Sequence, residues 1–105
     1  MSVILRDFIK IRDHLGLSDK LGLEIQFHHS EGFYFSMENR VMIGIKDGYR
    51  RRLLIHECLH VTGLMHYAAP GYESAINYDV YSEAIESDVF GELQANVPLS
   101  KLLES

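Results

Sequence analysis

Apolar residues along the chain are spaced first as in a helix and then as in a strand. They stand at positions 4, 5, 8, 9, 11 and 15, which predicts a helix over residues 3–15 that ends at Gly16. In residues 21–27 every second residue is apolar, and Glu24 and Gln26 lie between them. This alternation predicts a strand with one buried face.

Two more segments, residues 33–37 and 41–45, alternate in the same way. A three-residue turn at 38–40 would join them as a hairpin and put the two phenylalanines of the first segment on the same face as the apolar positions of the second. Residues 29–32 connect the first strand to the second, and this short connection also suits a hairpin. We therefore expect a small, mostly antiparallel sheet of three strands.

A second helix is predicted after the sheet. Asp47 and Gly48 interrupt the last strand, and the Asp47 side chain could cap a helix over residues 50–62. Gly63 is expected to end this helix, because a residue without a Cβ can take the left-handed conformation that reverses the chain.

The last part of the chain is predicted to form a loop over residues 68–77 and a closing helix over 79–96. The order of elements indicates an α+β fold with an N-terminal helix, three strands, a central helix and a C-terminal helix. No repeat, low-complexity tract or linker divides the sequence. We therefore expect residues 1–105 to form a single domain.

Composition and charge narrow the classes of function. A chain of 105 residues with 47% apolar residues suffices for one core. Its net charge of −5 argues against a dedicated nucleic-acid binder, which normally presents a basic face. The single cysteine, Cys58, excludes an internal disulfide and favours a reducing compartment. With no apolar run long enough to span a bilayer, we expect a cytoplasmic protein without a membrane partner; the oligomeric state stays open.

The central predicted helix carries the segment HECLHVTGLMH, residues 56–66. On a helix His56 and His60 lie one turn apart and point the same way, and Glu57 lies on that side as well. Two imidazoles at this spacing can hold one zinc ion, while the glutamate between them reaches a water beside the metal. The opposite face of the helix is apolar and includes Cys58, which we expect to be a core thiol.

The continuation of the segment supplies a third histidine. Three protein ligands leave a catalytic zinc one open position. A helix cannot bring residue 66 to the metal unless the chain turns sharply, and Gly63 stands where that turn is needed. The pattern thus predicts a Zn²⁺ site made by His56, His60 and His66, with Glu57 as the general base.

The string His56-Glu57-x-x-His60-x-x-Gly63-x-x-His66 resembles the extended zinc-binding signature of metzincin metalloproteases. The resemblance implies zinc-dependent hydrolysis of peptide bonds in a peptide or protein substrate. It also implies an antiparallel edge strand, here residues 33–37, along which the substrate lies extended. The chain departs from the family because it lacks the first strands of the usual sheet, so the fold would be a minimal version.

Residues 74–78 also resemble the methionine-containing turn of that family, with Ile76 in place of methionine. By this resemblance Ile76 would form an apolar floor below the metal. Tyr78 would match a tyrosine that some members place near zinc, where it would help to stabilise the oxyanion.

Three alternatives stay open. The segment around Glu83 resembles the helix that supplies a glutamate ligand in gluzincin peptidases, although Glu83 and Glu86 are also expected simply to face solvent. A ribosomal-RNA maturation endonuclease has the same three histidines and glycine, but its motif lacks the glutamate. The zinc could also only stabilise a non-catalytic binding module. Glu57 favours proteolysis, because neither of the last two requires a base at this position. The basic run at residues 50–52 is expected to be solvated or salt-bridged.

Overall fold

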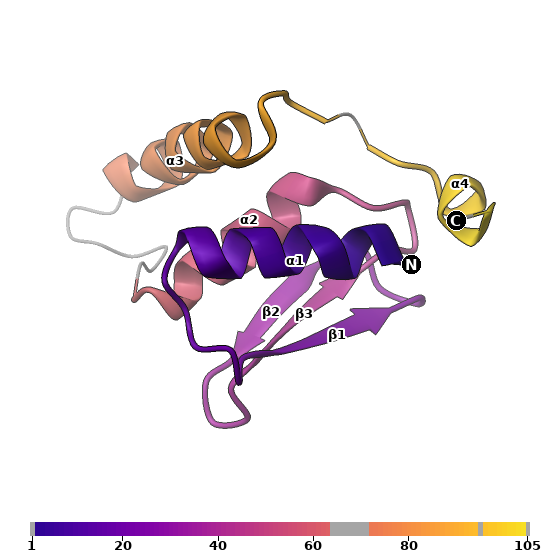
Figure 1. Ribbon diagram of the computed structural model, residues 1–105, viewed down its shortest axis with the longest axis horizontal. Helices are drawn as coiled ribbons and strands as arrows, with labels where there is room; N and C mark the ends of the chain where they lie inside the picture. Colours follow the sequence, from indigo (N-terminus) through magenta and orange to yellow (C-terminus); the bar gives the residue numbers. More distant parts are fainter. Residues whose placement is uncertain (1, 64–71, 95, 105) are drawn as a thin grey trace.

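A layer of helices covers one face of a three-stranded sheet (Figure 1). The computed structural model describes residues 2–63, 72–94 and 96–104; of residues 2, 72–79 and 104 it describes the backbone only. The elements in chain order are α1 (Ser2–His14), β1 (Gly22–Gln26), β2 (Gly32–Phe35), β3 (Arg40–Gly44), α2 (Arg51–Val61), α3 (Tyr72–Phe90) and α4 (Leu99–Glu104). The predicted α+β class is therefore confirmed.

The sheet is mixed and not mostly antiparallel. Its strand order is β1-β3-β2, with β1 parallel to β3 and β2 antiparallel to β3. The connection after β1 forms no hairpin; it passes the end of β3, where the Gly44 N–H donates to the Glu31 carbonyl and the Lys46 N–H donates to the His29 carbonyl. A Cβ at Gly44 would overlap that His29 carbonyl. Gly44 therefore permits the close crossing that places β3 in the centre of the sheet.

The predicted hairpin of β2 and β3 is present, but its register differs from the prediction. Phe35 pairs with Arg40, so residues 36–39 form the turn, and Asn39 takes a left-handed conformation with φ 51°. Phe33 consequently lies opposite Met42, whereas Tyr34 lies opposite Val41. A shift of one residue moves every side chain of a strand to the other face. The prediction that the phenylalanines share a face of the sheet with the buried residues of β3 is therefore wrong.

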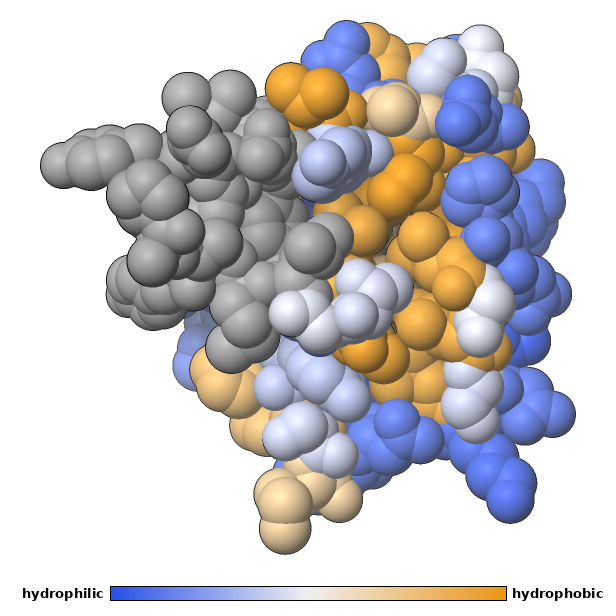
Figure 2. Space-filling view, turned by 90° about the vertical axis from the view of Figure 1, so that its left-hand side faces the viewer, coloured by the Kyte–Doolittle hydropathy of each residue, from blue (hydrophilic) through white to orange (hydrophobic). Residues whose placement is uncertain are grey.

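The core lies between the sheet and the helices α1 and α2. The prediction of α1 is confirmed, and Ile4, Phe8 and Ile11 form its buried face at helical spacing. On the molecular surface shown in Figure 2, apolar residues form a continuous area with polar residues along its right-hand and lower sides. The buried apolar residues are Ile4, Phe8, Ile11, Leu21, Val41, Ile43, Ile45, Tyr49, Leu54, Ile55, Cys58, Leu59 and Leu102.

Helix α2 is present where the sequence predicts it, but its first turn is capped differently. Arg50 occupies the N-cap position without a side-chain cap, and Asp47 instead accepts a hydrogen bond from the Asn96 amide through its backbone carbonyl at 2.9 Å. The predicted end is confirmed, because Gly63 follows the helix with φ 97°.

Helix α3 begins and ends earlier than predicted. It spans Tyr72–Phe90, so residues 74–78 are helical and do not form the predicted turn. No glycine or proline interrupts this range, whereas Gly91, with φ 73°, ends it. After α3 the chain returns to the start of α2, where Val97 and Tyr49 form an antiparallel bridge.

A buried ion pair joins α3 to the start of α2. The Arg51 guanidinium donates to the Glu86 carboxylate at 2.8 Å, lies over the Phe90 ring at 3.9 Å and donates to the Glu92 carbonyl. Glu86 is fully buried, so the expectation that it faces solvent is wrong. Arg52 also pairs with Glu86, at 3.4 Å, which confirms the expected salt bridging of the basic run.

Glu86→Gln is expected to lower the free energy of unfolding by about 3–5 kcal/mol, because it leaves the Arg51 charge buried without its counter-ion. The matched control Glu83→Gln removes a half-exposed carboxylate that pairs with Arg52 at 3.6 Å, and should cost under about 1 kcal/mol. Urea unfolding of the two variants measures both values. Equal losses in the two variants would contradict the assigned role of Glu86.

Candidate metal centre

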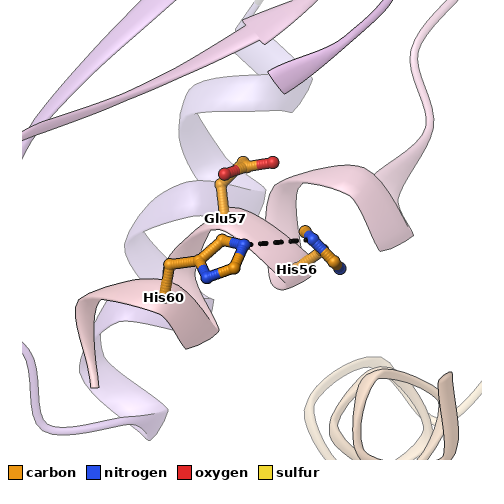
Figure 3. Close-up of side chains that lie close together, drawn as sticks. All are labelled: His56, Glu57 and His60. Carbon is orange, nitrogen blue, oxygen red and sulfur yellow. Dashed lines mark hydrogen bonds between the residues drawn. The ribbon is translucent and has the colours of Figure 1, made fainter. Parts of the chain in front are cut away.

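Two histidines from successive turns of α2 point toward one another (Figure 3). The Nε2 atoms of His56 and His60 are 3.2 Å apart, and the two rings meet edge to face at 84°. Both residues are only partly buried. The helix therefore presents two imidazole nitrogens together at an accessible position.

This spacing fits a shared metal ion. Zinc–nitrogen bonds of about 2.0–2.1 Å at a tetrahedral angle place two ligand nitrogens about 3.3 Å apart. One ligand atom from each of His56, Glu57 and His60 lies within 4.8 Å of the other two. Imidazole and carboxylate are donors that zinc accepts. The described residues thus fit two of the three predicted ligands and the predicted base.

Glu57 differs from the histidines because it is buried. Only 4% of its surface is exposed, and burial raises the pKa of its carboxyl group to about 7. In Figure 3 its side chain extends from α2 toward the sheet. A carboxylate in this position is close to the imidazole pair and yet lies against the neighbouring strand.

Gly32, the first residue of β2, provides the space for Glu57. A Cβ at position 32 would lie 2.7 Å from Cγ of Glu57 and 2.8 Å from its Oε2, distances at which one of the two residues must move. Sequence reasoning missed this role. The available signal was a glycine directly before a predicted strand, which often marks a close approach of another group.

A cleft of about 510 Å³ opens beside this contact. It is lined from the sheet side by Glu31 and Gly32, and from the helices by Arg50, Arg52, Leu53, His56, Glu57 and Ser82. Arg50 donates to the Ser30 carbonyl at 2.6 Å and so ties the start of α2 to the chain before β2. The Glu57 carboxylate and the His56 imidazole therefore face a space large enough for part of a ligand.

The other predicted site residues are placed as follows. His66 lies outside the described residues. Tyr78 lies in α3, of which the structure describes only the backbone at that position. Glu83 pairs with Arg52. Among the side chains that the structure describes, Glu83 does not belong to the group of His56, Glu57 and His60.

Cys58 is fully buried on the opposite side of α2, which confirms the expected core thiol. Burial raises the pKa of this thiol to about 12, mainly by desolvation.

Comparisons of the chain with protein-family models, curated proteins and solved structures find no match. Among the helices that the structure describes, none is both long and apolar enough to cross a bilayer. The motif and its geometry therefore carry the functional argument.

Gly32→Ala should lower the free energy of unfolding by about 1–3 kcal/mol, because the added methyl group overlaps the Glu57 side chain. In a Glu57→Ala background the same change should cost much less, since the overlapping atoms are gone. Urea unfolding of the four proteins in this double-mutant cycle measures the coupling.

The matched control is Gly22→Ala, at the first residue of β1, where a Cβ would meet Arg40 and lie away from α2. It should show no coupling to Glu57→Ala. A Gly32 effect that is unchanged by removal of the Glu57 side chain would contradict the assigned contact.

Proposed function

We propose that the protein is a zinc-dependent hydrolase of peptide bonds, in which His56, His60 and His66 hold the metal and Glu57 is the general base. The observation that carries the proposal is the position of His56 and Glu57 at a cleft beside an edge strand, with His60 adjacent to both. A site that only stabilised the fold would need neither a carboxylate next to the histidines nor an open cleft.

Three histidine ligands would leave one coordination position open. Zinc supplies Lewis acidity there, which polarises a peptide carbonyl and lowers the pKa of water. Glu57 accepts a proton from the attacking water as the water oxygen bonds to the carbonyl carbon. It then donates that proton to the amide nitrogen as the carbon–nitrogen bond breaks, which yields one carboxylic acid and one amine. Tyr78, on α3, stays the candidate for an additional donor to the oxyanion.

Strand β2 supports an extended substrate. It is one of the two outer strands of the described sheet, and it is antiparallel to β3. The Gly44 N–H donates to the Glu31 carbonyl, so the pairs of Glu31 with Gly44 and of Phe33 with Met42 carry the hydrogen bonds of this ladder. The backbone groups of Gly32 and Tyr34 therefore point to the free edge, where a peptide can add as a further strand.

The contacts of the basic run, residues 50–52, favour a peptide substrate over an RNA substrate. Arg51 and Arg52 pair with Glu86, and Arg50 donates to a backbone carbonyl beside β2. These cations are therefore already neutralised or held in place by the protein, and an RNA-cleaving site would need them for phosphates. A cytoplasmic location remains part of this proposal, based on the single buried cysteine.

The metal ligands are tested by zinc content and zinc affinity. Wild type is expected to hold about one zinc per chain, and His56→Ala and His66→Ala should each weaken binding by several kcal/mol, because an imidazole ligand is lost. Glu83→Ala is the matched control and should change the affinity little. Full zinc occupancy in His66→Ala, together with a loss of zinc affinity in Glu83→Ala, would identify Glu83 and not His66 as the third ligand.

The base is tested by Glu57→Gln, which retains the size of the side chain but cannot accept a proton. Zinc content should persist, and cleavage of a peptide library should fall by about 10²-fold or more. The control Glu38→Gln removes a carboxylate in the exposed turn after β2 and should leave cleavage unchanged. RNA cleavage that is insensitive to Glu57→Gln would favour the endonuclease alternative, and zinc binding without any hydrolysis by wild type would favour the structural module.

A further inference from the structure

A second cleft lies on the other side of β2, on the outer face of the sheet. It measures about 290 Å³ and is lined by His29, Glu31, Gly32, Phe33, Phe35 and Met42. Two of these residues, Glu31 and Gly32, also line the cleft at the proposed active site. The two clefts therefore lie on either side of the start of the same edge strand.

The aromatic residues of this outer cleft are more exposed than a folded core would leave them. Phe33 is 56% exposed and packs on Phe35, with ring centroids 4.9 Å apart. The Arg40 guanidinium lies over the Phe35 ring at 4.3 Å, which holds that ring in place. An exposed aromatic pair on the edge of a sheet favours unwanted pairing with other chains, and such a pair is typical of a binding surface.

The alternation of side chains determines which part of a peptide reaches this surface. Gly32 faces Glu57, so a substrate residue paired with Gly32 also faces α2, with its backbone beside the base. The substrate residues before and after it then face the outer side, next to Glu31 and Phe33. A cleft of about 290 Å³ is below the volume of a typical small-molecule site and suits a single side chain.

We propose that the outer cleft of Phe33, Phe35 and Met42 is a specificity subsite, which binds an apolar or aromatic side chain of an extended peptide substrate. That side chain belongs to a residue adjacent to the one paired with Gly32. The inference rests on the proposed peptide hydrolysis at the neighbouring cleft. The proposed substrates are peptides with a large apolar residue next to the position that faces Glu57.

Binding to the zinc-loaded Glu57→Gln variant tests the subsite without cleavage. Random octapeptides retained by this variant are sequenced, and one position should be enriched in phenylalanine, tyrosine, leucine or methionine. Addition of Phe33→Ala should remove the enrichment, because the exposed ring that contacts the side chain is lost. The matched control Phe27→Ala removes a 44% exposed phenylalanine just after β1, at the far edge of the sheet, and should preserve the enrichment.

The contribution of Phe33 to peptide affinity is measured with two retained octapeptides, which differ only by phenylalanine or alanine at the enriched position. Phe33→Ala should weaken binding of the phenylalanine peptide about 3- to 10-fold, the contribution of one aromatic pair, and leave the alanine peptide unchanged. Retention of no peptide, a pool without apolar enrichment, or an equal enrichment in Phe33→Ala would overturn the subsite. Selective retention of peptides that wild type does not cleave would instead refute the hydrolysis and leave the subsite intact.

Discussion

The close contact between Glu57 and Gly32 is the constraint on which the candidate site depends. A helix carrying a glutamate can approach a strand this closely only where the strand has no side chain. The contact removes the carboxylate from water and raises its pKa, while the histidines one residue before and three residues after it remain partly exposed. One glycine thus separates a buried carboxylate from two accessible imidazoles on the same helix.

The buried pair of Arg51 and Glu86 maintains the geometry around that contact. Removing two charges from water is unfavourable, and the attraction between them offsets this only when other hydrogen bonds complete the arrangement. Here the Gln94 N–H donates to Glu86 and Arg51 donates to the Glu92 carbonyl, so both ions have further partners. The network therefore places α3 against the first turn of α2 in one defined position, and Ser82 of α3 consequently lines the cleft.

Local patterns in the sequence predicted the elements that depend on neighbouring residues alone. The spacing of Ile4, Phe8 and Ile11 identified α1, and Gly63 identified the end of α2. The i and i+4 spacing of His56 and His60 on a helix predicted their contact, because helix geometry alone determines it.

The features that depend on distant residues were not predictable in this way. The parallel pairing of β1 with β3 depends on the passage of His29 over Gly44, and the register of the hairpin depends on one residue more or less in its turn. Glu86 appeared solvent-exposed in the sequence because its partner, Arg51, stands 35 positions away. The role of Gly32 was hidden for the same reason, since its contact is on another element.

The outer strand β2 is the element of the described fold best suited to hold the proposed peptide substrate. A deep pocket requires elements on several sides, whereas the clefts described beside β2 are open ones between the sheet and α2 or on the outer face of the sheet. An edge strand instead offers backbone donors and acceptors at every second residue, and a peptide added there aligns its own backbone with the strand. Such pairing carries little sequence preference of its own, because every peptide has the same backbone. Discrimination must therefore come from side chains on either face of the strand, and on β2 the inner face is occupied by the contact of Gly32 with Glu57. The outer face, with Phe33 and Phe35, is the one that remains available for the proposed selection of a substrate.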